Sequence, residues 1–140
     1  MDAQQMIERL NYDLAGEYQA IISYNQYAAS MTGPYRQELV EFFRDEIPDE
    51  LDHAQYLADK IAALGGTPTV EARQVTQLTE PRQMVEQVLR YEEQSVRDYT
   101  ERAHQAAELG DLGLKNHLET MVEQETHHLE ETRKLLQNWH

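Results

Sequence analysis

The stretch Glu50-Leu51-Asp52-His53 occurs a second time, in modified form, as Glu125-Thr126-His127-His128. In a helix, residues i and i+3 lie on one face, so each stretch directs a carboxylate and an imidazole the same way. A single Glu-x-x-His pair is common on exposed helices and favours no function by itself. The second copy is informative because each copy is accompanied by further residues at a fixed distance.

The two halves of the chain match when residue numbers are shifted by the difference between Glu50 and Glu125. We call this constant shift the repeat offset. Under this offset Glu17 corresponds to Glu92, and Tyr24 corresponds to Tyr99. Apolar positions follow the same offset: Leu14 with Leu89, Ile21 with Val96, Ala28 with Ala103, Leu39 with Leu114, Ile47 with Val122 and Ile61 with Leu136. The chain is therefore predicted to form two similar helical hairpins, each with Glu-x6-Tyr on its first helix and Glu-x2-His on its second.

Apolar residues recur at steps of three and four through four segments, which predicts four long packed helices and no strand. We expect these helices at about 2–31, 34–64, 80–109 and 111–138, separated by turns rich in Gly and Pro. The seams leave one-residue alternatives open, among them Leu14 or Asp13, Ile47 or Glu46, Leu89 or Val88, and Val122 or Met121. The expected fold is one all-α domain over 1–140, an antiparallel four-helix bundle.

Glu17 occupies the middle of the first seam, where burial of a lone carboxylate costs several kcal/mol. It therefore needs a partner, a proton or a metal. Residues equidistant from the turn of an antiparallel hairpin lie at the same height. Glu17 and Glu50 are centred on Gly33-Pro34, and the second pair, Glu92 and Glu125, is centred beside Gly110. Packing the hairpins together brings four carboxylates and two imidazoles into one polar layer, defined as Glu17, Glu50, His53, Glu92, Glu125 and His128.

The polar layer suits two divalent cations, because its four carboxylates would neutralise them. Mixed carboxylate and imidazole ligands favour iron or manganese. One Glu from each of two helices and Glu-x-x-His from each of the other two is the known ligand pattern of di-iron and di-manganese carboxylate proteins. We predict that all six residues of the polar layer are metal ligands.

Other polar residues have a weaker case. Glu93 stands beside Glu92, but the repeat offset and the seam both favour Glu92, so we expect Glu93 to be solvated. His127 points about 100° away from His128 on a helix and is expected at the surface. No partner in the repeat supports His104, His117 or His140.

Two interpretations of Tyr24 and Tyr99 remain open. Each is either a core residue with a satisfied hydroxyl or, beside a redox metal, a group that bonds a ligand carboxylate or supplies an electron. Glu46, one turn before Glu50, is a candidate for an extra carboxylate on an iron path. Pro48 removes a backbone hydrogen bond within the second helix and is expected to kink or split it.

The composition excludes several classes of protein. The absence of cysteine excludes disulfides, zinc–thiolate sites, Cys-ligated iron–sulfur clusters and thiol catalysis. A net charge of −14, from 26 acidic and 12 basic residues, disfavours nucleic-acid binding. No apolar run approaches about 18 residues, and the N-terminal residues lack signal-peptide features. We expect a cytoplasmic protein with neither nucleic-acid nor membrane partners.

These motifs resemble those of the ferritin-like superfamily, and within it bacterioferritin. The resemblance covers nearly the whole chain and rests on Leu14-Ala15-Gly16-Glu17 with Tyr24, Glu50-Leu51-Asp52-His53-Ala54, Glu92, and Glu125-Thr126-His127-His128. It implies a ferritin-like bundle with a long crossover, 65–79, between the second and third helices. Such a crossover must climb about 40 Å, and 15 residues can reach about 50 Å.

The resemblance also implies a function. It indicates a ferroxidase centre of two iron ions in each subunit, which oxidises Fe(II) with dioxygen or peroxide in iron storage or detoxification. By resemblance, Glu50 and Glu125 bridge the ions, and the subunits form at least a homodimer. We also expect Tyr24, near the redox metal, to be catalytic together with the six ligands. The alternatives are a di-iron or di-manganese peroxidase, catalase or oxygenase on the same ligands, or a non-enzymatic metal-binding assembly protein.

Two features depart from the family patterns. Bacterioferritin binds haem through a Met directly after the first Glu of its second-helix motif; here that residue is Leu51, so we expect no haem. The chain ends at His140, without the fifth helix of cage-forming ferritins, which argues against a 24-subunit shell. The chain also lacks the ligand set that Dps proteins place across a dimer interface and the Cys-rich domain of rubrerythrins.

Overall fold

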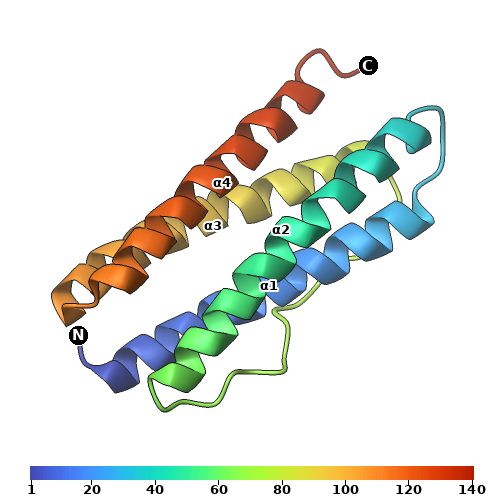
Figure 1. Cartoon of the computed structure of the whole chain (residues 1–140). Coiled ribbons are helices and arrows are strands. Elements are labelled where there is room, and N and C mark those ends of the chain that lie inside the picture. Colours follow the sequence, from blue (N-terminus) through green and yellow to red (C-terminus); the bar gives the residue numbers. More distant parts are fainter.

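The computed structural model describes residues 1–140 as four helices without a strand (Figure 1). The helices are α1 (Ala3–Ser30), α2 (Arg36–Ala63), α3 (Pro81–Leu109) and α4 (Leu112–Leu136). Each bound lies within two residues of the predicted one, and the all-α prediction is confirmed. None of the four helices is long and apolar enough to cross a membrane.

Local sequence signals account for the helix ends. At the start of α1, the Asp2 side chain accepts a hydrogen bond from the backbone N–H of Gln5 at 2.8 Å, and the Gln5 side chain accepts one from the backbone N–H of Asp2 at 3.0 Å. Asp111 caps α4 by accepting from the N–H of Leu114 at 3.0 Å. Gly110 ends α3 with φ +84°, a left-handed conformation that glycine adopts without strain.

The helices form two antiparallel hairpins, α1 with α2 and α3 with α4, that lie side by side (Figure 1). The connection between α2 and α3 runs back along α1. Hydrogen bonds to successive residues of α1 hold it there, among them Thr69 N–H to the Asn11 side chain at 2.8 Å, Arg73 N–H to Ala15 O at 3.0 Å, Gln19 Nε2 to Gln74 O at 2.6 Å and Tyr27 Oη to Thr76 O at 2.5 Å. The predicted long crossover is therefore confirmed, and α2 and α3 run parallel.

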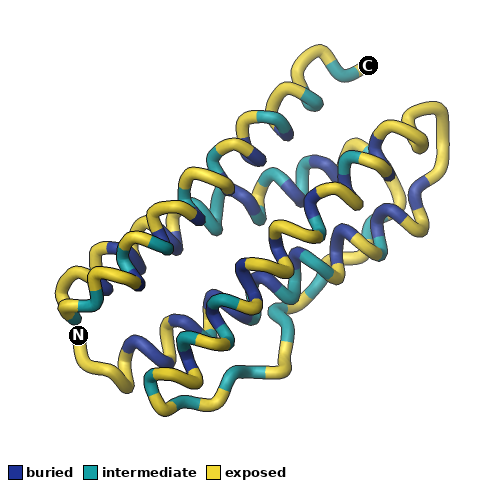
Figure 2. The backbone as a smooth tube through the Cα atoms, viewed as in Figure 1, coloured by how far each residue is buried: buried dark blue, intermediate teal, exposed yellow.

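The apolar core consists of two clusters with the polar layer between them. One cluster holds Leu14 and Ala54, and the other holds Ala20 and Phe43. Glu17 falls between Leu14 and Ala20 on α1. Glu50 likewise falls between Phe43 and Ala54 on α2. Buried residues line the inward faces of all four helices (Figure 2), so the polar layer interrupts an otherwise continuous core.

The structure decides between the one-residue alternatives that the seams left open. The seam positions Ile47, Leu89 and Val122 are only partly buried, and the residues directly before them, Glu46, Val88 and Met121, are buried instead. Alternating steps of three and four drift around a helix of 3.6 residues per turn, so a seam can shift by one residue. Pro48 was expected to kink or split the second helix, and the split is wrong, because α2 is continuous through Pro48. Pro48 lies on the exposed face of α2, where water can satisfy the carbonyl that it leaves without a donor.

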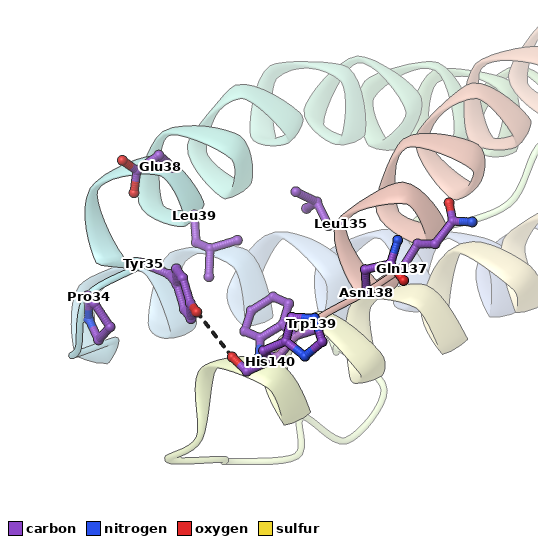
Figure 3. Close-up of a pocket in the computed structure, with 9 residues that line it drawn as sticks. All are labelled: Pro34, Tyr35, Glu38, Leu39, Leu135, Gln137, Asn138, Trp139 and His140. Carbon is purple, nitrogen blue, oxygen red and sulfur yellow. Dashed lines mark hydrogen bonds between the residues drawn. The ribbon is translucent and has the colours of Figure 1, made fainter.

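A surface hollow of about 540 Å³ lies at the end of the bundle where α2 begins and the chain ends (Figure 3). Tyr35 donates a hydrogen bond across it to the carbonyl of His140 at 3.1 Å and packs edge-on against Trp139 at 5.2 Å between ring centroids. None of the nine residues that line this hollow belongs to the polar layer. This hollow is therefore separate from the polar layer.

Candidate metal centre

The structure brings all six predicted ligands together. Glu17 comes from α1, Glu50 and His53 from α2, Glu92 from α3, and Glu125 and His128 from α4. Each of these residues is at most 5% exposed. Ionisable groups are rarely buried to this extent unless they are paired, protonated or bound to a cation.

The two imidazoles face each other across a pair of shared carboxylates. The Nδ1 atom of His53 lies 3.3 Å from Glu125 and 3.9 Å from Glu50. The Nδ1 atom of His128 lies 3.4 Å from Glu50 and 3.7 Å from Glu125. Glu50 and Glu125 thus lie between the two rings, where bridging ligands would stand, while Glu17 is 3.6 Å from His53 on one side.

The donor atoms form two clusters, each compact enough for one cation. Glu17, Glu50, His53 and Glu125 can present one donor atom each with all four atoms within 4.8 Å of one another. A second group meets the same distance criterion and contains Glu46, Glu92 and His128. The sequence offered Glu46 as an alternative to Ile47 on the seam and as a carboxylate on an iron path; in the structure its Oε2 lies 2.9 Å from Nδ1 of His128.

The fit of the site to cations can be tested on its unpaired atoms. Ten buried side-chain atoms make no hydrogen bond of good geometry, and three of them, Gln26 Oε1, Arg73 Nε and Asp98 Oδ2, lie outside the site. The other seven are Glu17 Oε2, Glu46 Oε2, Glu50 Oε1, His53 Nδ1, Glu92 Oε1, Glu125 Oε1 and His128 Nδ1. An unsatisfied buried polar atom costs about 1–3 kcal/mol. Because all seven belong to the two clusters, two cations would satisfy them together. Carboxylate oxygens with imidazole nitrogens suit iron or manganese.

The other nitrogen of each imidazole is held by an outer residue. Nε2 of His128 lies 3.0 Å from Oδ2 of Asp49, and Nε2 of His53 lies 2.6 Å from Oε1 of Gln124. Both acceptors place the proton on Nε2 and leave Nδ1 as the ligand atom, an arrangement usual for metal-bound histidines. Asp49 and Gln124 were missed at the sequence level, although they also correspond under the repeat offset.

Two tyrosines bond carboxylates of the opposite hairpin. Tyr24 on α1 donates a hydrogen bond to Glu92 on α3 at 3.4 Å, and Tyr99 on α3 donates one to Glu17 on α1. Both phenols are buried. The structure thus satisfies each hydroxyl on a carboxylate of the polar layer, which fixes the orientation of Glu17 and Glu92.

In the absence of cations, the polar layer holds protons. Burial lowers the pKa of His53 and of His128, but contacts with carboxylates, chiefly Glu125, outweigh burial and raise these values to about 10 and about 11. Burial raises the pKa of Glu92 to about 8, and burial with the nearby charge of Glu125 raises that of Glu50 well above its usual value. Burial opposes ionisation of Glu125, yet its contacts with the two imidazoles keep its pKa below the ordinary range. Two imidazolium ions and protonated carboxyls thus take the place of cations.

A buried ion pair lies one turn from the layer. Arg102 on α3 donates to Asp13 on α1 through Nε at 2.8 Å and Nη2 at 3.0 Å, and each residue is 2% exposed. The pair ties α1 to α3 beside the contact between Tyr99 and Glu17. Arg102 was missed because its counterpart under the repeat offset is Tyr27, so the repeat gives no signal. As predicted, His127 is exposed, and Glu93 is partly exposed and bonds Arg133 at 3.3 Å.

Comparison with known proteins identifies the same architecture. Residues 7–140 match the family model described as a ferritin-like domain. A structure of ferritin-like, diiron-carboxylate proteins from Bacillus anthracis str. Ames is 48% identical, with 96% of each chain covered and a TM-score of 0.93. Desulfovibrio desulfuricans bacterioferritin, described with a diiron site, is 25% identical over 96% of this chain and 80% of that chain, with a TM-score of 0.87. A dodecameric thioferritin from Bacteroides fragilis, 21% identical over 99% of this chain and 88% of that chain, has the same fold at a TM-score of 0.89. No relative is found among curated protein sequences.

Proposed function

Because this chain belongs to the ferritin-like family, we propose that it is a di-iron ferroxidase, which binds two Fe(II) ions in the polar layer and oxidises them with dioxygen or peroxide. One observation carries the proposal. Seven buried donor atoms without hydrogen bonds belong to two adjacent clusters. The clusters are in contact because His128 of one lies 3.4 Å from Glu50 of the other. This arrangement is costly for a purely structural core and suits a pair of cations.

The proposed ligand assignment follows the distances. Glu17 and His53 would hold one ion and Glu92 and His128 the other. Glu50 and Glu125, each within 3.9 Å of Nδ1 of both imidazoles, would be available to both ions. Glu46 is an additional ligand candidate on the side of His128. We include Tyr24 in the catalytic set because it bonds Glu92 from inside the core.

The chain contributes ligands, orientation and proton exchange. To bind a cation, His53 and His128 give up the Nδ1 proton, and Glu50 and Glu92 give up the carboxyl proton, while Asp49 and Gln124 keep Nε2–H in place. Iron supplies the electron-transfer chemistry. Two Fe(II) ions lose one electron each, which with two protons reduces dioxygen to hydrogen peroxide or hydrogen peroxide to two water molecules.

We further propose that the chain works as a homo-oligomer, at least a dimer. The dodecameric thioferritin of the same fold supports this expectation. Light scattering on the purified protein measures the molar mass, which for one chain is 16.4 kDa. The mass of a single chain would contradict the proposal. The mass of a dimer would favour iron oxidation alone, and the mass of a closed shell would favour iron storage.

Aerobic oxidation of Fe(II), followed by absorbance of the ferric product, tests the ferroxidase assignment. We expect Glu50→Ala and His128→Ala to abolish turnover. The chain offers matched controls, because His127→Ala and Glu93→Gln change the neighbours of proposed ligands on the outer face of the same helices. Wild-type rates in Glu50→Ala and His128→Ala would refute the assignment. Protein that is isolated with manganese and shows peroxide turnover instead would favour a catalase.

A further inference from the structure

The two halves of the polar layer are not equivalent. The repeat offset pairs Asp49 with Gln124 and Glu46 with Met121. In each pair the residue on α2 is acidic and its counterpart on α4 is uncharged. Both acidic residues contact His128, so the asymmetry concentrates negative charge on one side of the site.

The first difference lies behind the imidazoles. His128 donates Nε2–H to the carboxylate of Asp49 at 3.0 Å, whereas His53 donates to the neutral amide oxygen of Gln124 at 2.6 Å. A carboxylate acceptor raises the basicity of a metal-binding imidazole more than an amide does, and loss of such an outer partner typically weakens metal binding about 10–100-fold. On this ground His128 is the stronger ligand.

The second difference lies inside the layer. Glu46 is 8% exposed, and its Oε2 makes no hydrogen bond although it lies 2.9 Å from Nδ1 of His128. Its counterpart Met121 is fully buried in the apolar core. Glu50 and Glu125 each lie within 3.9 Å of Nδ1 of both imidazoles, so they are open to either ion. Apart from these two, the side of His128 has two carboxylates, Glu46 and Glu92, and the side of His53 has one, Glu17. A hard divalent cation prefers the side with more carboxylate oxygen.

We propose that the polar layer binds divalent cations in a fixed order, first between Glu92, Glu46 and His128 and then between Glu17 and His53. Asp49 is a positioning residue that acts through His128 and sets this order, and Gln124 is its weaker counterpart behind His53. The inference rests on the proposed function only in requiring that the layer bind two cations.

Calorimetric titration of metal-free protein with Co(II), which avoids oxidation, measures the two affinities. The wild type should show two steps whose dissociation constants differ by about 10-fold or more. Asp49→Asn preserves shape and removes the charge, and we expect it to weaken the tighter step about 10-fold while leaving the other step unchanged. Gln124→Glu, also close in shape, should tighten the weaker step. Asp45→Asn is the control, because Asp45 is exposed one turn before Asp49 and contacts neither imidazole.

Anomalous scattering at the cobalt edge then locates the first ion. In crystals grown with one Co(II) per chain, we expect the ion beside His128 in the wild type. In Asp49→Asn/Gln124→Glu, the occupancy beside His53 should rise. Equal occupancy of the two halves in the wild type, or an unchanged distribution in the double variant, overturns the fixed order while two bound ions leave the proposed function standing. Absence of cobalt from the layer overturns both.

Discussion

Raising the pH of the metal-free protein should destabilise it, because its folded state holds protons that the unfolded chain releases. The pKa values of His53 and His128 rise from 6.5 to about 10 and about 11 on folding. Their stabilising contribution is therefore complete below about pH 6.5 and is lost as the pH rises toward 10 and 11. Glu92, whose pKa rises from 4.5 to about 8, acts with the same sign between those values.

The magnitude follows from proton linkage. Each proton that is bound to the folded state and absent from the unfolded state contributes a slope of about 1.4 kcal/mol per pH unit. The two imidazoles alone set a range of about 1.4–2.8 kcal/mol per pH unit between pH 7 and 8.5. This slope is a large fraction of the stability of an ordinary domain, about 5–15 kcal/mol.

Urea unfolding of chelator-treated protein, followed by circular dichroism at pH 6.5, 7.5 and 8.5, measures the slope. His128→Gln should reduce the slope by about 1.4 kcal/mol per pH unit, since it removes one linked proton, and His127→Gln should leave it unchanged. Saturating Co(II) displaces the same protons, so the stabilisation by Co(II) should grow with pH. A stability of the metal-free protein that is constant or rises over this range would refute the proton-filled layer.

Three further predictions concern single contacts. Arg102→Met should lower the free energy of unfolding, measured with urea, by about 3–5 kcal/mol, because it leaves Asp13 buried and unpaired. The double variant Asp13→Val/Arg102→Met should recover most of this loss, since it removes both charges and gives position 13 the residue of its repeat counterpart, Val88. Tyr99→Phe removes the hydrogen bond to Glu17 and should cost about 1–3 kcal/mol in the same assay, whereas Tyr12→Phe, an exposed control on α1, should cost little. Glu92→Gln should reduce the Co(II) bound at equilibrium dialysis from two ions to one per chain, whereas Glu93→Gln should retain two. Loss of an ion from the Glu93 variant alone would contradict the assignment of Glu92 as the ligand.

The repeat made the hairpins and the polar layer predictable. A spacing of three residues defines a helix face, and equal distances from two turns define a height, so Glu17, Glu50 and their counterparts could be brought to one level without any knowledge of the fold. The helix ends were also predictable within two residues, because Asp2, Gly110 and Asp111 are strong local signals. These features depend on contacts close in sequence or related by the repeat.

The residues that were missed depend on how the hairpins are rotated against each other. Asp49 and Gln124 stand on the outer edges of α2 and α4, where a surface role is the ordinary expectation, and only the packing of the hairpins brings them to His128 and His53. The same rotation decides that Glu46, and not Ile47, faces inward. The pair Asp13 and Arg102 breaks the repeat, so symmetry could not indicate it.

The central claim is that the polar layer holds two cations, and a diffraction experiment tests it directly. Crystals of the protein soaked anaerobically with Fe(II) should give two anomalous peaks per chain at the iron edge, one beside Glu17 and His53 and one beside Glu92 and His128, with Glu50 and Glu125 between them. Iron found only on carboxylates of the outer surface, with no peak in the polar layer, would contradict the account.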